Sequence, residues 1–370
     1  MAASDEETSG LAQRADQGDK AAIFKLLELA RAGKPDAQVR IGKIYYDGLV
    51  VQRNFPLALN WLQKAAAKGQ AQAMNLIGHM YQEALGVEQD YVKARLWYRQ
   101  AAEAGFAPAA NNLGWLYLKG DGSGKSPTLA KEWFERAADQ ELPAAQYNLA
   151  YLYASGTGVP RNPQRALELY RAAAEKGYAP ALRAIGWLYQ TGQGVQSDPA
   201  EARSWYEKAS AQGELEAEAM LGQMYQQGLG VTRDLDEARR HYETSAAGGD
   251  PLGQLFLGWL YQQGMGVAQD YASALAWYQK SAAQGNATAQ NNIGYLYNEG
   301  LGVERDYQMA FDWYSKAAKQ GEPTALYNVG FMYEEARGVA RNLDAAFRYY
   351  QMAAEKGHQE AKRIVGRSVR

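Results

Sequence analysis

The pattern of apolar and polar residues along this chain repeats every 36 positions. Each period holds a small anchor residue with apolar residues one before and two after it, as with Ile77 and Met80 around Gly78. A Tyr stands three residues after the anchor in all nine full periods. Positions three and four apart share one helix face, so a helix, named helix A here, is predicted around every anchor. The anchors are Gly42, Gly78, Gly114, Ala150, Gly186, Gly222, Gly258, Gly294, Gly330 and Gly366.

A second helix, named helix B, is predicted in each period after a turn. The connecting loop often reads Gly-x-Gly-Val, as at residues 228–231, and Gly supplies the positive φ that ends a helix. Twelve residues past each anchor stands Asn, Asp or Ser. Such a side chain accepts hydrogen bonds from a first helical turn and stabilises it by about 1 kcal/mol. An Ala four residues further on, followed by an aromatic pair such as Trp97-Tyr98, predicts close packing of small against large side chains.

These helix pairs predict an all-α solenoid, because one pair cannot bury its apolar face alone and must stack on the next. We expect nine tandem helix-turn-helix repeats over residues 37–360. The terminal segments depart from the pattern, as repeat-protein caps do. Residues 1–10 are expected to form a disordered polar N-terminus, residues 11–36 an N-terminal helical cap, and residues 361–370 a C-terminal capping helix.

The repeated motif resembles the Sel-one-like repeat, a relative of the tetratricopeptide repeat with a longer loop between its helices. Residues 293–321 match the motif almost position for position, and the resemblance covers roughly residues 37–366. It implies a right-handed α/α superhelical solenoid whose A helices line a concave groove, used mostly in bacteria as a scaffold for protein partners. Departures from the motif are Ala150, His241, Val50 and the loop of residues 120–126, which we interpret as repeat drift.

The composition of the chain argues against several classes of function. The formal net charge is −2, with 39 Lys+Arg against 41 Asp+Glu, so the basic surface of a nucleic-acid binder is not expected. No apolar stretch reaches the roughly 18 residues of a membrane helix, so no membrane insertion is expected. The chain has no Cys, which excludes disulfides, thiolate metal sites and Cys nucleophiles.

Candidate chemistry is sparse. Gly124-Lys125-Ser126 ends like a phosphate-binding loop, but the required earlier glycine is Lys119 and no strand precedes it. The three His residues lie far apart, without the spacing of a zinc-ligand pair. Carboxylates such as Asp198 fall in first turns of B helices, where capping favours them. We therefore expect no catalytic residues, no cofactor, no metal and no small-molecule substrate, and we interpret the protein as a non-enzyme.

The positions that the repeat does not assign to its core are the candidates for binding. One residue past the anchor, at the plus-one position, six of nine residues are aromatic: Trp115, Tyr151, Trp187, Trp259, Tyr295 and Phe331. One helical turn earlier, at the minus-three position, Tyr147, Arg183 and Tyr327 would frame these rings, together with Asn75, Asn111, Leu255 and Asn291. Tyr, Trp and Arg dominate the energetics of protein interfaces. The sequence therefore predicts a protein-binding row on the A helices, and the alternative is that these rings are core between repeats.

The predicted function is a bacterial scaffold or adaptor that binds a protein partner, for instance a secreted effector or an envelope protein. Resemblance to the family suggests two narrower alternatives. One is a periplasmic immunity protein that neutralises a type VI secretion phospholipase effector, and the other is a secreted virulence factor that binds a host immune protein. Met1-Ala2-Ala3 and the polar residues 4–10 resemble a mature N-terminus behind a start Met. We therefore expect a periplasmic or secreted protein, with the cytoplasm as the alternative.

Overall fold

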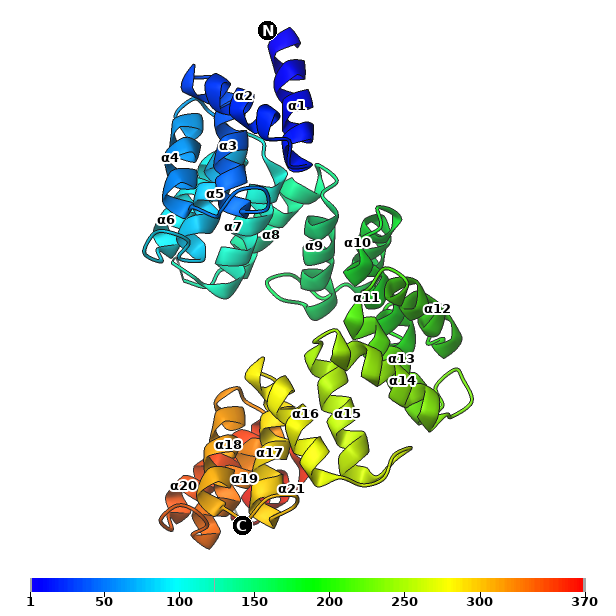
Figure 1. The fold of residues 1–370 in the computed structure, drawn as a ribbon. Helices are drawn as coiled ribbons and strands as arrows, with labels where there is room; N and C mark the ends of the chain where they lie inside the picture. The colour runs from blue at the N-terminus through cyan, green and yellow to red at the C-terminus, as the bar shows by residue number, and fades with distance from the viewer. Residues whose placement is uncertain (1, 123, 369–370) are drawn as a thin grey trace. The chain divides into compact units, whose positions relative to one another are not determined.

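The computed structural model describes residues 2–122 and 124–368, and it divides into two compact units, residues 1–181 and 182–370, each described by itself. All secondary structure in the described residues is helical (Figure 1). The boundary between the units falls within α11 (Ala179–Thr191). The helices before it are α1 (Ala2–Asp16), α2 (Lys20–Arg31), α3 (Pro35–Asp47), α4 (Phe55–Ala66), α5 (Ala71–Gln82), α6 (Tyr91–Glu103), α7 (Ala107–Lys119), α8 (Pro127–Ala138), α9 (Pro143–Ser155) and α10 (Pro163–Glu175).

The second unit continues the same alternation. Its further helices are α12 (Pro199–Ser210), α13 (Leu215–Gln227), α14 (Leu235–Ala247), α15 (Pro251–Gln263), α16 (Tyr271–Ala283), α17 (Ala287–Glu299), α18 (Tyr307–Lys319), α19 (Pro323–Glu335), α20 (Leu343–Glu355) and α21 (Gln359–Ser368). Odd-numbered helices from α3 onward contain the anchors and are the A helices, and even-numbered helices from α4 onward are the B helices. Helices pack chiefly against their neighbours along the chain. The predicted all-α solenoid of helix-turn-helix repeats is confirmed.

All nine predicted capping residues cap a B helix through their side chains. In α12, the Asp198 carboxylate accepts hydrogen bonds from the backbone N–H groups of Ala200 and Glu201, both at 3.0 Å. Pro199 fills the first helical position, where its missing N–H costs nothing. The nine are Asn54, Asp90, Ser126, Asn162, Asp198, Asp234, Asp270, Asp306 and Asn342. The start of every repeat's B helix was thus predictable from a short polar side chain, Asn, Asp or Ser, at one position of the repeat.

The anchor glycine allows a B-helix ring to lie directly on helix A. A Cβ on Gly258 would lie 2.8 Å from two ring carbons of Tyr278, which is completely buried. The Tyr278 hydroxyl donates a hydrogen bond to Gln262 Oε1 at 2.6 Å. Equivalent bonds join Tyr98 to Gln82, Tyr206 to Gln190 and Tyr242 to Gln226. Burial disfavours the phenolate and raises the pKa of all four tyrosines above the ordinary value.

Adding one methyl group at an anchor is expected to destabilise the protein. In Gly258→Ala the new Cβ must displace the Tyr278 ring, and overpacking of this kind costs about 1–3 kcal/mol. Gly366→Ala is the matched control, because this anchor lies in α21 with nothing within 4 Å of an added Cβ. The control should be neutral or slightly stabilising, since Ala favours a helix over Gly. Urea unfolding followed by circular dichroism measures both, and equal effects would contradict the packing role.

One period has Ala150 in place of the anchor glycine. The Ala150 methyl occupies space that a glycine leaves to the B-helix ring. Tyr170 in α10 packs against Tyr147 in α9, with ring centroids 5.4 Å apart, and Tyr350 packs against Tyr327 at the same distance in the repeat anchored by Gly330. Residue 154, where four other periods place the accepting Gln, is also Ala. The ring contact of Tyr170 with Tyr147 is thus made with Ala as well as with Gly at the anchor.

The second glycine of the loop has a different task from the first. Gly228 (φ 73°) ends α13 in the left-handed conformation, and a Cβ there would meet only the Arg233 side chain at 3.3 Å and backbone beyond it. Gly230 (φ 68°) lies against the first turn of the preceding B helix. A Cβ on Gly230 would lie 2.7 Å from the carbonyl carbon of Pro199 and 2.9 Å from the nitrogen of Ala200. The second glycine thus lets consecutive repeats touch through their backbones.

The first and last described segments of the chain are helical. Residues 2–10 lie within α1, where the sequence predicts a disordered polar segment. The helix is held by its later residues: Ala15 packs in a core cluster with the fully buried Leu26 of α2, and Arg40 of α3 forms an ion pair with Asp16. Arg40 also donates a hydrogen bond to the carbonyl of Ala12 at 3.1 Å. At the other end α21 begins at Gln359, and residues 369–370 of the expected C-terminal cap lie outside the described residues.

Candidate protein-binding face

The plus-one side chains keep much of their surface exposed, although their neighbours along helix A are buried. Ile185 and Leu188, on either side of Trp187, are fully buried. Trp259 and Phe331 are half-buried, and the other four aromatic members are the most open: Trp115 at 37%, Tyr151 at 46%, Trp187 at 40% and Tyr295 at 41%. Trp115 and Tyr151 belong to the first unit and the rest to the second. Each unit therefore presents aromatic surface on its A helices.

The first of these rings borders a recess between two A helices. A cavity of about 300 Å³ lies beside Trp115, lined also by Gln82 of α5 and by Asn112 and Lys119 of α7. The Trp115 ring packs edge-on against Phe134, with centroids 6.1 Å apart and planes at 77°. One side of the ring is thus fixed by the core while another borders the recess. An anchored ring beside amide and charged groups is suited to recognising a polypeptide.

Other plus-one positions make polar contacts that the sequence did not indicate. The guanidinium of Arg337 lies 5.1 Å from the ring centroid of Phe331 and 5.3 Å from that of Tyr307, a cation–π arrangement on both sides. His79 is the plus-one residue of the repeat anchored at Gly78. Its Nδ1 is 2.7 Å from the hydroxyl of Tyr46. These contacts orient plus-one side chains from the neighbouring loop or repeat.

The aromatic minus-three residues pack on the residue that precedes the next A helix. Tyr327 stacks on His358, with centroids 4.5 Å apart and planes at 18°. Tyr147 contacts Tyr178 in a tilted arrangement, with centroids 5.5 Å apart and planes at 59°. The partner stands 31 residues further along the chain in both cases. The expected framing residues therefore also join consecutive repeats, which spacing within a single helix could not indicate.

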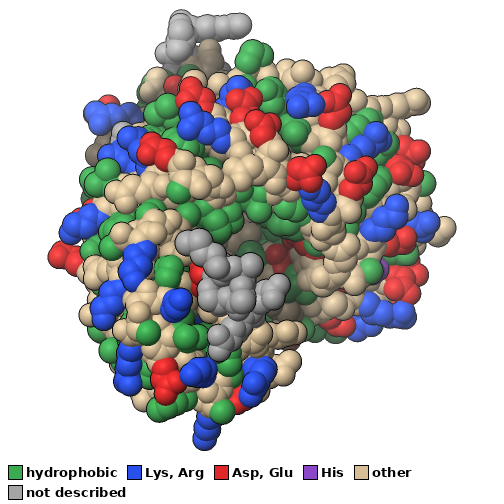
Figure 2. Space-filling view, turned by 90° about the horizontal axis from the view of Figure 1, so that it is seen from above, with side chains coloured by type: hydrophobic (Ala, Val, Ile, Leu, Met, Phe, Trp, Pro, Cys, Tyr) green, Lys and Arg blue, Asp and Glu red, His purple; other side chains and the backbone are tan. Residues whose placement is uncertain are grey.

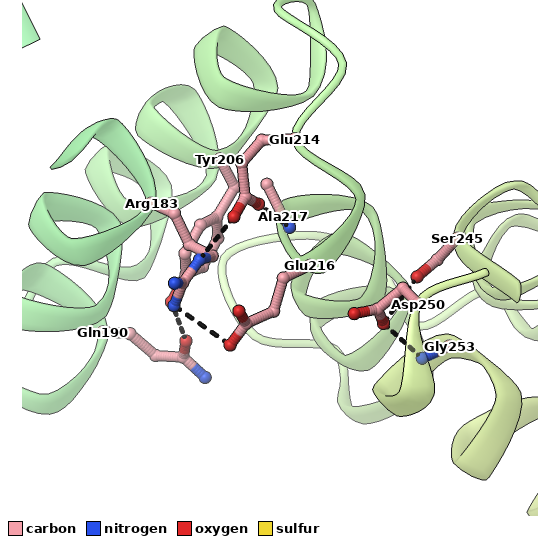
Figure 3. Close-up of polar contacts among 9 residues, drawn as sticks. All are labelled: Arg183, Gln190, Tyr206, Glu214, Glu216, Ala217, Ser245, Asp250 and Gly253. Atoms are coloured by element: carbon pink, nitrogen blue, oxygen red, sulfur yellow. Dashed lines mark hydrogen bonds and ion pairs between the residues drawn. The ribbon is translucent and has the colours of Figure 1, made fainter. Parts of the chain in front are cut away.

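Arg183, another minus-three residue, contacts the next repeat through ion pairs (Figure 3). Its Nε lies 2.9 Å from Glu214 and its Nη1 lies 3.0 Å from Glu216, both near the start of α13. Glu214 also accepts a hydrogen bond from the Ala217 backbone N–H at 2.6 Å, capping that helix. Burial raises the pKa of the Glu216 carboxyl, the Arg183 guanidinium opposes this shift, and the charges of Glu214 and Asp250 add to it. Arg183 thus fixes one repeat to the next through two carboxylates.

The minus-three amides form a third kind of joint. Asn111 Oδ1 accepts a hydrogen bond from Asn148 Nδ2 at 2.7 Å, and Asn291 accepts one from Asn328 at 2.9 Å. Asn75 and Asn112 make the same bond at 3.0 Å. Each pair bridges two consecutive A helices. The minus-three residues are therefore candidates for binding, and some of them also hold consecutive repeats together.

His241, another departure from the motif, also has a structural explanation. Its ring stacks on Tyr225, with centroids 5.4 Å apart and planes at 16°, in the place where other repeats carry Trp. His241 Nδ1 lies 2.6 Å from Glu218 Oε2. The second oxygen of Glu218 accepts a hydrogen bond from the Ser210 hydroxyl. Because the carboxylate stands between the Ser and the His, this is not the order of a Ser-His-acid triad.

The remaining chemical candidates lie in loops and caps. Ser126, the end of the apparent phosphate-binding motif, is the N-cap of α8. Among the described residues, no cluster of three His, Cys, Asp or Glu could hold a metal ion. No helix in the described ranges is long and apolar enough to cross a bilayer. On the face shown in Figure 2, acidic and basic side chains are interspersed over much of the surface.

Comparison with protein families matches nearly the whole chain. The Sel1 repeat model matches nine consecutive segments, residues 35–70, 71–106, 107–142, 143–178, 179–214, 215–250, 251–286, 287–322 and 323–358. Each segment begins at or beside the first residue of an A helix and ends before the next one. No protein with a curated description matches the chain.

Solved structures show the same architecture. The chain is similar to a protective antigen of uropathogenic Escherichia coli strains that displays an SLR fold, with 30% identity, 93% of this chain and 82% of that chain covered, and a TM-score of 0.58. A Sel1 repeat protein from Oxalobacter formigenes is 33% identical, with 66% and 96% covered and a TM-score of 0.60. An immunity protein from Pseudomonas aeruginosa is 22% identical, with 58% and 81% covered and a TM-score of 0.47, a likeness too distant to bear on function.

Proposed function

Because the chain belongs to the Sel1 repeat family, we propose that it is a non-enzymatic bacterial scaffold that binds a protein partner along the plus-one row of its A helices. The observation that carries the proposal is the exposure of Trp115, Tyr151, Trp187 and Tyr295 by more than a third of their surface. Large rings held in an open position by a rigid helix lose little entropy on binding and bury a large area. They are the side chains that most often dominate a protein interface.

The test is affinity capture from cells that express the gene naturally, with the wild type compared with the triple variant Trp187→Ala, Trp259→Ala, Tyr295→Ala. We expect the variant to lose a stoichiometric partner, because an interface anchor truncated to Ala costs about 2 kcal/mol or more of binding free energy. The variant's free energy of unfolding should fall only modestly, since two of the three rings are exposed by about 40%.

A matched control removes exposed apolar side chains elsewhere in the same unit. Met309→Ala, Leu343→Ala and Met352→Ala change B-helix side chains that are 36%, 55% and 46% exposed. This control should keep the partner. If the plus-one variant keeps its partner and instead loses several kcal/mol of stability, the rings are core and the proposal is wrong.

We also propose that the protein acts outside the cytoplasm, in the periplasm or after secretion. The similar Escherichia coli protein is a protective antigen, and this favours the secreted alternative over the other narrow roles. Fractionation of the cells with an antibody against the chain tests it, and recovery only from the cytoplasm would contradict it. The role of an immunity protein against a phospholipase effector stays a prediction from the resemblance of the sequence.

A further inference from the structure

One B helix lacks the large ring that its counterparts place over helix A. Nineteen residues past the anchor, six full repeats carry Trp, at positions 61, 97, 133, 205, 277 and 313. Two others carry rings that stack on the Tyr three past the anchor: His241 on Tyr225 and Tyr349 on Tyr333, with centroids 5.4 and 5.9 Å apart. The repeat anchored at Ala150 has Leu169 there and so lacks the ring that would stand opposite Tyr153.

A cavity of about 480 Å³ lies at this place in the first unit. Residues of three consecutive helices, α8, α9 and α10, line it. Leu149 and Leu169, both buried, line it together with Tyr153. The cavity shares no residue with the plus-one or minus-three rows. A site here is therefore separate from the plus-one row, although it rests on the same proposed function of binding a protein partner.

A buried acceptor without a partner lines the same cavity. Gln146 is only 8% exposed, and its Oε1 accepts no hydrogen bond from any described residue. At the same position of two other repeats, Oε1 of Gln254 and of Gln290 accepts a hydrogen bond from Gln284 and Gln320, at 3.0 and 2.9 Å, whereas Oε1 of Gln38 is unpaired like that of Gln146.

The repeat of Gln146 has Lys176 in place of that donating Gln. The Lys176 ammonium turns to Glu141 instead, at 3.1 Å from its carbonyl and 2.6 Å from its carboxylate. Leaving a buried acceptor unpaired costs about 1–3 kcal/mol. A donor brought by a ligand would recover that cost.

The rim of the cavity is acidic. Glu135, Asp139 and Glu168 line it, against a single basic lining residue, Arg165. Arg165 pairs with Glu168 at 2.7 Å, and Glu135 pairs with Lys131 at 2.6 Å. The Asp139 carboxylate is exposed and has no ion-pair partner within the described ranges. The cavity thus offers carboxylates, one buried amide oxygen and an aromatic ring to a cationic ligand.

We propose that this cavity binds an arginine side chain of a protein partner. The aliphatic stem would lie on Leu149 and Leu169, and the guanidinium would lie near the Tyr153 ring. A guanidinium carries five N–H donors in a plane, enough for the Gln146 oxygen and the Asp139 carboxylate together. It is also less strongly hydrated than an ammonium and stacks on aromatic rings, which favours arginine over lysine in a cavity of this kind.

The test is titration of the full-length protein with the peptide acetyl-Gly-Arg-Gly-amide, followed by NMR of the Leu149 methyl groups. A matched peptide carries citrulline, which keeps the shape of arginine without its charge. We expect saturable binding of the arginine peptide with a dissociation constant on the order of 1 mM, and at least tenfold weaker binding of the citrulline peptide.

Three variants locate the site. Leu169→Trp fills the cavity with the residue that six other repeats already accommodate, and it should weaken binding of the arginine peptide at least tenfold while the protein stays folded. Asp139→Asn should weaken binding about threefold. Glu132→Gln, which changes an exposed carboxylate of α8 that does not line the cavity, should leave binding unchanged. Equal binding of the two peptides, or undiminished binding by Leu169→Trp, would overturn the proposal.

Discussion

Raising the pH above 10 is expected to unfold this protein steeply, because its buried B-helix tyrosines can ionise only after leaving the core. Burial raises the native pKa of Tyr206, Tyr242 and Tyr278 above the ordinary value of 10.0, whereas the same groups ionise normally in the unfolded chain. The unfolded state therefore releases protons that the native state keeps. Their contribution to stability is complete below pH 10 and is lost as the pH rises, by about 1.4 kcal/mol per pH unit for each tyrosine.

The triple variant Tyr206→Phe, Tyr242→Phe, Tyr278→Phe isolates this effect. Phe134 already occupies the equivalent position in α8, so the ring itself is accommodated there. Near neutral pH the variant should lose about 1 kcal/mol for each hydrogen bond to Gln. Between pH 10 and the native pKa values, its stability should fall with pH about 4 kcal/mol per unit less steeply than that of the wild type. Urea midpoints measured across this range give the two slopes, and parallel slopes would contradict the explanation.

Gly230→Ala is expected to destabilise the protein far more than Gly228→Ala, although both glycines have nearly the same φ. Both substitutions place an L side chain in the left-handed region, which costs about 1–2 kcal/mol. Two other repeats tolerate this strain at the first loop position. Ala84 and Ala336 stand there with φ of 55° and 54°. At Gly230 the methyl group must also push away the backbone of Pro199, which adds about 1–3 kcal/mol.

Comparing these two variants cancels the strain that they share. Urea unfolding at neutral pH should show a modestly lowered midpoint for Gly228→Ala and a much lower one for Gly230→Ala. Similar midpoints would mean that the contact between repeats can relax at little cost. The second glycine would then be no more important than the first.

The fold was predictable because every signal of it is local and repeated. Each capping residue, such as Asp198, acts on its own helix, and each anchor, such as Gly258, acts on the next helix along the chain. The N-terminus was less predictable, because residues 2–10 continue a helix that is held by Ala15 and Arg40 rather than by their own pattern.

The candidate site was predictable only in part. The spacing placed Trp187 and Tyr295 outside the helix core, and their exposure is consistent with that. The contacts of Arg183 with Glu214 and Glu216 could not be foreseen, because they join residues 31 and 33 positions apart in different helices. The sequence does show that Leu169 occupies a position where the other repeats have Trp, His or Tyr. Only the structure shows that a ring at this position can stack on the Tyr three residues past the anchor.

The backbone contact made by the second loop glycine has a consequence at the level of the gene. Gly230 meets main-chain atoms of Pro199 and Ala200, and Gly302 meets main-chain atoms of Tyr271 and Ala272, so the joint depends little on which side chains occupy the preceding helix. Unequal recombination that removes or copies one 36-residue period, at any phase, would rejoin such backbones in the same way. A coding sequence of this kind can change length by whole multiples of 108 nucleotides, three for each of 36 codons, while this backbone contact is kept at the junction.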